Sequence, residues 1–372
     1  MPQTDIVAPE REGVRAHFAW HMTGRWTFMN SSHKTMLRSW GVAIMTMLLA
    51  LVLAACASQP AATEPETTEP EAAAVEPVEV RVASLKGPTS IGLASFMGNV
   101  DSLELTNTYT FTIATAADEI LPSVIQGETD IALVPANVAA VLYNKTEGGV
   151  SVIDINTLGV LNIVTGDESI QQFSDLAGKT VYMTGKGATP EYAMNYLLGK
   201  AGIADQVTLE FKSEPTEVVQ AISADTTAVG LLPQPFATAA CIKNEALKAV
   251  IDLTDVWAST VDDGSQFLTG VTVVRNDFLA EHPEAVAEFV AQQSASVDAA
   301  NADPAAVAPL VVQAGIIDAE GVAAKAIPGC HLVCITGEDM KTALSGYLQT
   351  LFDSDPTSVG GKLPADDFYW LG

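Results

Sequence analysis

A short segment near the C-terminal end contains the residue types best suited to metal binding or nucleophilic chemistry. It reads Gly329-Cys330-His331-Leu-Val-Cys334. Thiolate and imidazole groups bind soft metal ions and act as nucleophiles, but this segment supplies at most three ligands. A Cys330–Cys334 disulfide, formed in an oxidising compartment, or two small buried cysteines is the better interpretation. We expect no metal and no cofactor, with a metal or catalytic role as the weaker alternative.

Other catalytic arrangements are not apparent along the chain. His282 precedes a proline that can start a helix, so we expect a solvated residue at a helix terminus rather than a catalytic base. No Ser-His-Asp order and no paired-carboxylate motif is present. The 45 acidic residues leave open a carboxylate pair that forms only in the folded chain. We expect the protein not to be an enzyme.

Two glycine-containing loops each follow an expected strand and precede an expected helix. They are the segments Lys86-Gly87-Pro88-Thr89-Ser90 and Gly185-Lys186-Gly187-Ala188-Thr189. Glycine allows close backbone approach, and a capping hydroxyl leaves neighbouring amides free for an anion. The spacing of a nucleotide-hydrolysing Walker loop and of a dinucleotide fingerprint is missing from both. Each loop could equally be an ordinary turn before a capped helix.

Two amide side chains stand at similar strand-to-helix transitions. Asn137 follows the expected strand 131–134, and Gln234 follows the expected strand 228–232. An amide can both donate and accept a hydrogen bond, so each could contact a ligand or close its own loop. A wall against which a ligand stacks could come from Trp257, Gln266, Tyr182 and Tyr192, although aromatic residues more often belong to a core.

The elements that would position these loops alternate between strand and helix. β-rich runs occur at 78–82, 109–113, 131–134, 160–164, 180–183, 207–211, 228–232, 250–253 and 271–274. Helical patterns separate most of them, with clear starts at Thr189-Pro190 and near Pro283. This alternation over nearly 300 residues predicts an α/β fold with largely parallel sheets in two domains. Ligands of such sheets bind beyond the carboxyl ends of the strands.

Composition narrows the class of partner. The chain has 372 residues, of which 48% are hydrophobic, so it can bury a large core. Its formal charge of −27 argues against nucleic acid as a partner, because proteins that bind phosphate backbones concentrate positive charge.

The N-terminal part of the chain has the features of a targeting segment. Residues 1–55 form a signal region, whose apolar run from Trp40 to Ala55 follows Lys34 and Arg38. Residues 1–35 look dispensable, since Met36 could start a compact signal. Leu53-Ala54-Ala55-Cys56 resembles the bacterial lipobox, which implies lipidation of Cys56; a single-pass anchor is the alternative. Residues 57–77, rich in Pro and Glu, read as an extended tether beyond this cysteine.

From Val78 to Gly372 the chain resembles the extracytoplasmic solute-binding proteins of ABC importers, in the group of nitrate, sulfonate, taurine and thiamine-precursor binders. The resemblance lies in the order of five stretches, which cover residues 82–91, 127–137, 175–182, 230–236 and 273–283. It implies the type II periplasmic-binding-protein fold, with two α/β lobes joined by two hinge strands. Residues 78–165 and 270–372 would form one lobe, and residues 166–269 the other.

The resemblance also implies a site and a role. The cleft contacts would come from Lys86, Gly87, Pro88, Thr89, Ser90, Asn137, Gly185, Gly187, Ala188, Thr189 and Gln234. These loops contain no arginine, so the expected solute is a sulfonate or nitrate-like anion held by amides and lysine, or a neutral vitamin or pyrimidine precursor. We expect a lipid-anchored monomer on the outer face of the cell membrane that delivers its solute to a permease. An enzyme of the same fold, such as a precursor synthase, and a surface sensor lipoprotein are the alternatives.

Overall fold

The structure is a computed structural model that describes residues 76–372. The expected signal region, Cys56 and all but the last two residues of the expected tether lie outside the described residues. None of the described helices is both long and apolar enough to cross a membrane.

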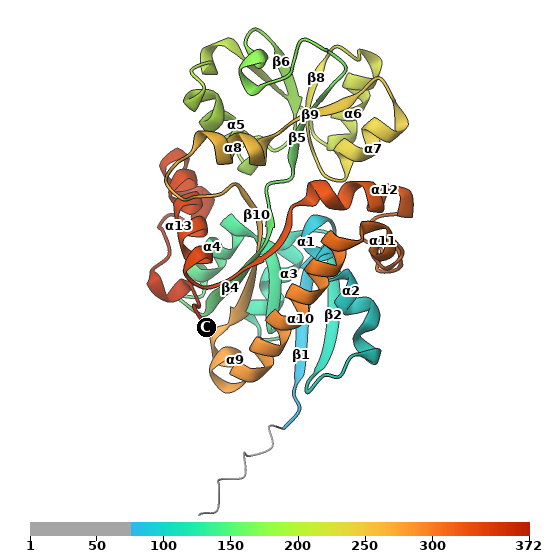
Figure 1. Ribbon diagram of the computed structural model, residues 1–372. Coiled ribbons are helices and arrows are strands. Elements are labelled where there is room, and N and C mark those ends of the chain that lie inside the picture. The colour runs from blue at the N-terminus through green and yellow to red at the C-terminus, as the bar shows by residue number, and fades with distance from the viewer. Residues whose placement is uncertain (1–75) are drawn as a thin grey trace, which may run out of the picture. The chain divides into compact units, whose positions relative to one another are not determined.

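A six-stranded mixed sheet forms one half of the fold (Figure 1). Its strands, in spatial order, are β11 (Leu332–Ile335), β4 (Val150–Leu158), β10 (Leu268–Arg275), β3 (Ile131–Pro135), β1 (Glu79–Leu85) and β2 (Thr108–Ala114). β1 runs parallel to β2 and β3, whereas β10 runs antiparallel to both β3 and β4. We call this sheet and its helices the six-stranded lobe.

A five-stranded sheet forms the other half. Its order is β7 (Thr208–Phe211), β6 (Thr180–Met183), β8 (Val229–Pro233), β5 (Leu161–Thr165) and β9 (Lys248–Asp252). β6 is parallel to β7 and β8, and β5 is antiparallel to β8 and β9. We call this sheet and its helices the five-stranded lobe.

The chain crosses between the sheets twice, once between β4 and β5 and once between α8 and β10. The first crossing lies at Gly159 and Val160, so the lobe boundary expected after Thr165 comes one strand too late. β4 and β5 are separated by only these two residues, and β4 itself was not among the expected strands. The two-lobe α/β fold class is confirmed.

The expectation of largely parallel sheets is wrong. A parallel neighbour needs a helical crossover on one face of the sheet, and β1–β3 and β6–β8 have such crossovers. β5 and β10 instead enter their sheets from the other lobe, and each runs antiparallel to both of its neighbours. β11 is antiparallel to β4 as well, so both sheets are mixed.

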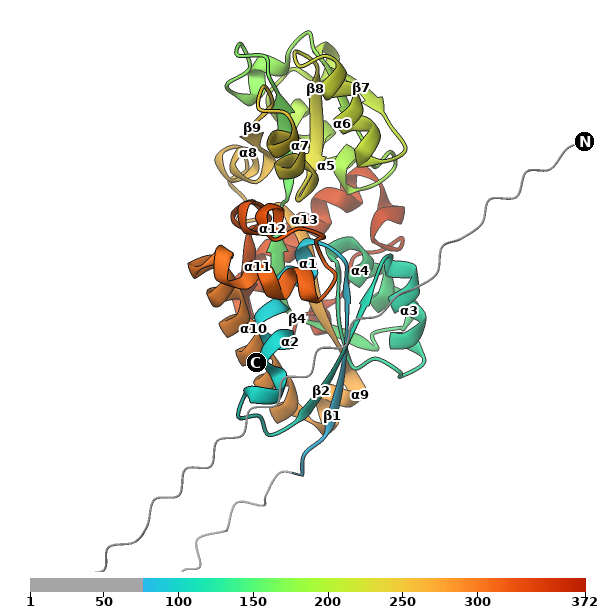
Figure 2. The ribbon, with the colours of Figure 1, turned by 90° about the vertical axis from the view of Figure 1, so that its right-hand side faces the viewer.

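Helices cover both faces of the six-stranded sheet. Figure 2 shows α10 and α11 on one side of it, and α3 and α4 on the other. The helices of this lobe are α1 (Pro88–Ile91), α2 (Ala94–Asn99), α3 (Ala117–Ile125), α4 (Ala136–Lys145), α9 (Asn276–Glu281), α10 (Pro283–Ala302), α11 (Pro304–Gln313), α12 (Glu320–Ala326) and α13 (Gly337–Ser354). The five-stranded lobe has α5 (Thr189–Lys200), α6 (Pro215–Ala224), α7 (Phe236–Lys243) and α8 (Leu253–Thr260).

The expected helix starts are met with one difference in detail. α10 begins at Pro283 and buries Val286, Phe289 and Val297, as its spacing predicts, whereas Val290, expected on the same face, is only partly buried. α5 begins at Thr189, which is the first helical residue, and its N-cap is Ala188 without a side-chain cap bond. The expected capping by the Thr189 hydroxyl is therefore wrong, because that hydroxyl lies inside the first turn.

Candidate ligand-binding site between the lobes

A cavity of about 540 Å³ lies between the two lobes. Its larger wall belongs to the six-stranded lobe and consists of Lys86, Gly87, Thr115, Ile316, Ile317, Asp318, Ala319 and Val322. The opposite wall belongs to the five-stranded lobe and consists of Pro235, Phe236 and Ala239. This volume falls within the range of ordinary small-molecule sites.

Three strand or helix ends build the walls. β1 and β2 end at Leu85 and Ala114, which puts Lys86 and Thr115 just beyond the carboxyl ends of two parallel strands. α7 begins at Phe236 immediately after β8, and α12 faces it from the other lobe (Figure 1). The loop between α11 and α12 supplies the remaining apolar wall. The site thus lies where ligands of α/β sheets are expected.

The first predicted loop reaches this cavity only in part. Lys86 and Gly87 line it, and Gly87 has a φ of 128°, a conformation that favours glycine. Thr89 and Ser90 are buried, and both hydroxyls donate to the carbonyl of Leu85. These hydroxyls therefore do not cap α1, and neither residue lines the cavity. Pro88 is the first residue of α1 and does not line the cavity.

The second predicted loop does not line this cavity. Gly185 and Gly187 have φ angles of 85° and 70°, as an open glycine turn requires. The Gly187 amide donates to Glu191 Oε2 at 2.5 Å, so a carboxylate of the chain occupies one of the amides expected for a ligand anion. The hydroxyl of Tyr192 lies 3.1 Å from the Gly187 carbonyl oxygen and 2.9 Å from Asp355 Oδ2. The loop consequently faces the end of α13.

Ala188 and Thr189 complete that loop beside a buried aromatic group. Trp257 and Phe267 stack at 5.7 Å between ring centroids, and Tyr347 of α13 packs edge-on against Trp257 at 5.8 Å. Burial raises the pKa of Tyr347. This group joins α8 and α13, and so the two lobes, through apolar contact, away from the cavity described above.

The two predicted amides are held by the protein itself. Asn137 Nδ2 donates to the carbonyl of Ser358 at 3.2 Å. Gln234 Oε1 accepts from the hydroxyl of Thr238 at 2.8 Å, and its amide nitrogen packs against Gly329 of the six-stranded lobe. Gln234 therefore closes its own loop, which is one of the two expected alternatives, whereas Asn137 joins α4 to the distant segment at Ser358.

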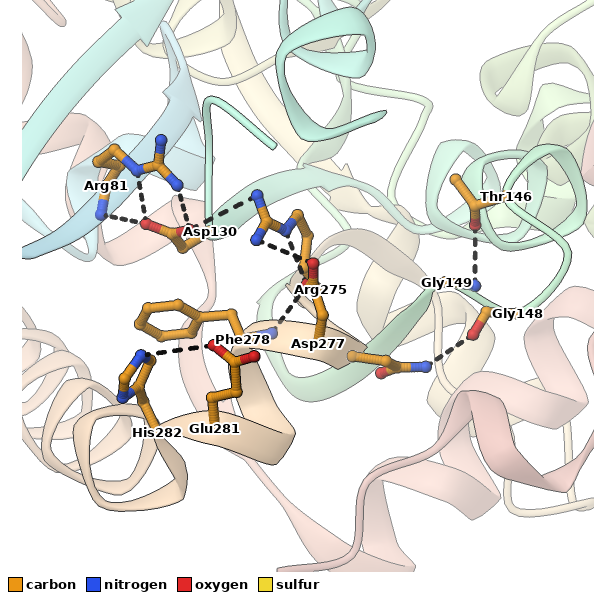
Figure 3. A network of polar contacts seen from close by, with 11 residues as sticks. Arg81, Asp130, Thr146, Gly148, Gly149, Arg275, Asp277, Phe278, Glu281 and His282 are labelled. Carbon is orange, nitrogen blue, oxygen red and sulfur yellow. Dashed lines mark hydrogen bonds and ion pairs between the residues drawn. The ribbon is translucent and has the colours of Figure 1, made fainter. Parts of the chain in front are cut away.

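Both arginines of the described chain serve structure at the far end of the six-stranded sheet (Figure 3). Arg81 Nε and Nη2 donate to the two oxygens of Asp130 at 2.8 and 2.6 Å. Arg275 lies 3.7 Å from the same carboxylate and makes two bonds to Asp277. Asp130 precedes β3, so this cluster is remote from the carboxyl ends of β1 and β3. No guanidinium among the described residues reaches the cavity.

Of the two expected alternatives for Cys330 and Cys334, the structure shows free cysteines rather than a disulfide, with Cys330 buried and Cys334 partly buried. Cys330 Sγ points at the Ala326 carbonyl at 3.2 Å, and Cys334 Sγ lies 4.0 Å from the Val290 carbonyl. Burial raises the pKa of each thiol to about 12. Within residues 76–372, no group of three His, Cys, Asp or Glu residues is placed to hold a metal ion.

His331 connects the first crossing to the end of β9. It adopts a left-handed conformation with φ 46°, and its Nδ1 lies 2.6 Å from the carbonyl oxygen of Gly159 in the first crossing. Its Nε2 lies 3.4 Å from Asp252 Oδ2, at the end of β9. Burial raises the pKa of Asp252. The histidine is therefore a bridge at the hinge, and the expected solvated His282 caps α10 next to Glu281 (Figure 3).

Sequence reasoning missed most of the apolar walls. Phe236 lies two residues after the predicted Gln234, and its aromatic side chain is the one local feature that could have indicated a ligand-binding wall. Ile316, Ile317 and Val322 come from a loop and helix about 230 residues after Lys86, with no motif of their own. Only the folded chain brings them to β1.

Two mixed sheets, two crossings and a cavity between the lobes define the class of two-lobe binding-protein folds. Within that class, the chain belongs to the family described as NMT1/THI5 like, which it matches over residues 111–307, more than half of its length.

Individual relatives agree with this assignment. A "Putative binding protein" of Brucella abortus (strain 2308) is 24% identical over 236 residues, which cover 61% of this chain and 70% of the relative. The fold matches a crystal structure of an ABC transporter from Parabacteroides distasonis, with a TM-score of 0.67, 24% identity, and coverage of 78% of this chain and 98% of that one. It also matches the periplasmic aliphatic sulphonate binding protein of Escherichia coli, with a TM-score of 0.62, 13% identity, and coverage of 78% and 92%.

Proposed function

We propose that this protein is the solute-binding component of an ABC importer and that it holds its solute in the cavity between the lobes. The observation that carries this proposal is that residues of both lobes line the cavity. A solute there contacts both lobes at once, so its binding favours the closed arrangement over an open one. Closure around the solute is the signal that a membrane permease would read.

The first crossing is built as a hinge in this proposal. Gly159 is packed so tightly that a Cβ atom would come within 2.1 Å of Phe267 Cδ1. The Thr254 hydroxyl and His331 Nδ1 both reach the Gly159 carbonyl. Such contacts fix the position of the crossing between the two sheets.

Delivery to a permease requires a place outside the cytoplasm. We propose that Cys56 carries a lipid anchor and that residues 57–77 hold the binding lobes away from the membrane surface. The sequence around Cys56 supports this part of the proposal. The names of the relatives as binding proteins support a role without catalysis.

Native mass spectrometry of the purified protein tests the function, because a co-purified solute of defined mass is expected. Ala239→Trp and Ala319→Trp each place a large side chain in the cavity, from opposite walls. Each should expel the solute and abolish the rise in melting temperature that the solute gives the protein. Ala224→Trp, at an exposed position at the end of α6, is the control and should keep both. Retention of the solute by both cavity variants would show that it binds elsewhere.

A further inference from the structure

The cavity has a definite chemical character. Phe236, Ile316, Ile317 and Val322 give it a mainly apolar lining. Two charged side chains stand on the same lining, Lys86 and Asp318. A bare inorganic anion would leave the apolar walls unfilled, because a cavity of about 540 Å³ suits a molecule with a substantial apolar body.

Neither charge on the lining is neutralised by the described part of the chain. Lys86 and Asp318 are exposed, and among residues 76–372 neither makes an ion pair or a side-chain hydrogen bond. Thr115, the other polar side chain on the lining, donates to Glu119 at 2.5 Å and so has its proton engaged. The lining therefore presents one cationic and one anionic side chain, each of which can pair with a charged group of a ligand.

We infer that the solute is zwitterionic, with an apolar body between its charges: an anionic group would meet Lys86 and a protonated amine would meet Asp318. This inference rests on the proposed function and names its substrate class. A singly charged anion would satisfy Lys86 but would leave Asp318 to repel it. A singly charged amine would meet the converse difficulty. A molecule with both charges and an aliphatic or aromatic centre satisfies both side chains and fills the space beside Phe236.

Four small probes separate these possibilities by isothermal titration calorimetry with the purified protein. Aminohexanoate with a terminal amine carries both charges and an apolar chain, hexanoate and hexylamine each carry one charge, and glycine carries both charges without the chain. Aminohexanoate should bind about two- to fivefold more tightly than hexanoate or hexylamine, the range expected from one exposed ion pair. It should also bind more tightly than glycine, because its chain buries apolar surface in the cavity. Equal binding of the four probes, or no binding of any, would overturn the inference.

Two substitutions assign the charges. In Lys86→Met, aminohexanoate should lose its advantage over hexylamine, and in Asp318→Asn it should lose its advantage over hexanoate. Lys362→Met changes a charge outside the cavity and is the matched control, which should keep the order of the four probes. An advantage that survives both cavity substitutions would overturn the inference, and thermal melting of each variant checks that it is folded.

The outcome also distinguishes this inference from the proposed function. If no probe binds while Ala239→Trp still expels the co-purified solute, the cavity is the solute site and the substrate class is wrong. If Ala239→Trp leaves that solute in place, the cavity is not the solute site, and both proposals fail.

Discussion

The hydroxyl of Tyr192 lies 2.9 Å from Asp355 Oδ2, and this contact joins the five-stranded lobe to the six-stranded lobe. Tyr192 belongs to α5, and Asp355 caps the short helix that follows α13. Burial raises the pKa of Tyr192, and the hydrogen bond to Asp355 raises it further. The same bond contributes to the lowered pKa of Asp355. The contact is therefore a polar latch between lobes, on the side of the hinge where the second glycine loop lies.

Removal of this latch should weaken solute binding more than it lowers stability. Tyr192→Phe keeps the ring and removes the hydroxyl, so the closed arrangement loses one interlobe hydrogen bond. The dissociation constant of the co-purified solute, measured by calorimetry, should rise severalfold, with little change in the melting temperature. Tyr182→Phe, in the middle of β6, is the control. Unchanged affinity in Tyr192→Phe would show that the latch has no part in closure.

The buried carboxyl of Asp154 should make stability depend on pH. Its side chain is fully buried in β4, where Oδ1 accepts from Thr272 and Gln293 and Oδ2 has no partner among the described residues. Burial raises its pKa to about 7, above the value of about 3.9 in an unfolded chain. The folded state thus binds more protons between these two values, and stability falls as the pH rises from about 4 to about 7.

Asp154→Asn tests that pH dependence because it keeps the shape and removes the charge. The free energy of unfolding, measured by urea denaturation, should be higher than that of the wild type by roughly 2–4 kcal/mol at pH values above 7. The difference should shrink toward pH 4. A difference that is constant across this range would mean that Asp154 does not titrate in it.

Gly159 should tolerate no side chain. A Cβ atom there would lie 2.1 Å from Phe267 Cδ1 and 2.6 Å from Thr254 Oγ1, so Gly159→Ala should cost about 1–3 kcal/mol in the free energy of unfolding. Gly199→Ala is the matched control, since nothing lies within 4 Å of its Cβ position inside α5. That control should be neutral or slightly stabilising, as expected for alanine in a helix. Denaturant titration of both variants gives the comparison, and equal stabilities would contradict it.

Asp130 should be required for the stability of the six-stranded lobe. Its carboxylate is 1% exposed and lies against Arg81 and Arg275 (Figure 3). Asp130→Asn keeps the shape but removes a charge that β1 and β10 share, and should cost about 1–3 kcal/mol by urea denaturation. Asp205→Asn, in the five-stranded lobe, should leave stability unchanged. A small effect at Asp130 would show that Asp277 alone suffices for Arg275.

The two cysteines of the C-terminal segment should be unreactive in the folded protein. A thiol with a pKa of about 12 forms little thiolate at pH 8, so iodoacetamide should leave Cys330 and Cys334 unmodified until the chain unfolds. Peptide mass mapping with and without urea measures this. A mass loss that corresponds to a disulfide before reduction would contradict the free thiols.

The sequence predicted the order of strands and helices well because alternation of apolar residues is a local signal. All nine expected strands from 78–82 to 271–274 fall on observed strands within a few residues, but neither the short β11 nor the long β4 was predicted. β4 is the more instructive of the two. Asp154 and Asn156 interrupt its apolar run, although both are buried and hydrogen-bonded within the sheet. In a sequence, a polar residue that is buried and hydrogen-bonded inside a core cannot be distinguished from a polar residue of a loop.

The candidate site was predicted less completely for a different reason. Lys86 and Gly87 follow a strand, and their position identifies them. Thr89, Asn137 and Gln234 have the same local signature, but the protein itself takes up their hydrogen-bonding groups. No local pattern reveals whether a polar side chain will find a partner elsewhere in the chain. The wall at Ile316 and Ile317 depends on the packing of α11 and α12, which is a property of the whole lobe.

The position of β10 between β3 and β4 has a consequence for how the chain is made. Residues 161–252, which carry every strand of the five-stranded sheet, leave the ribosome as one uninterrupted piece, and their pairing partners are all present by Asp252. The other sheet still lacks its interior strand at that moment, so β3 and β4 have exposed edges until Leu268–Arg275 arrives. The five-stranded lobe can therefore fold first, and the cavity wall at Ile316 is synthesised only after it.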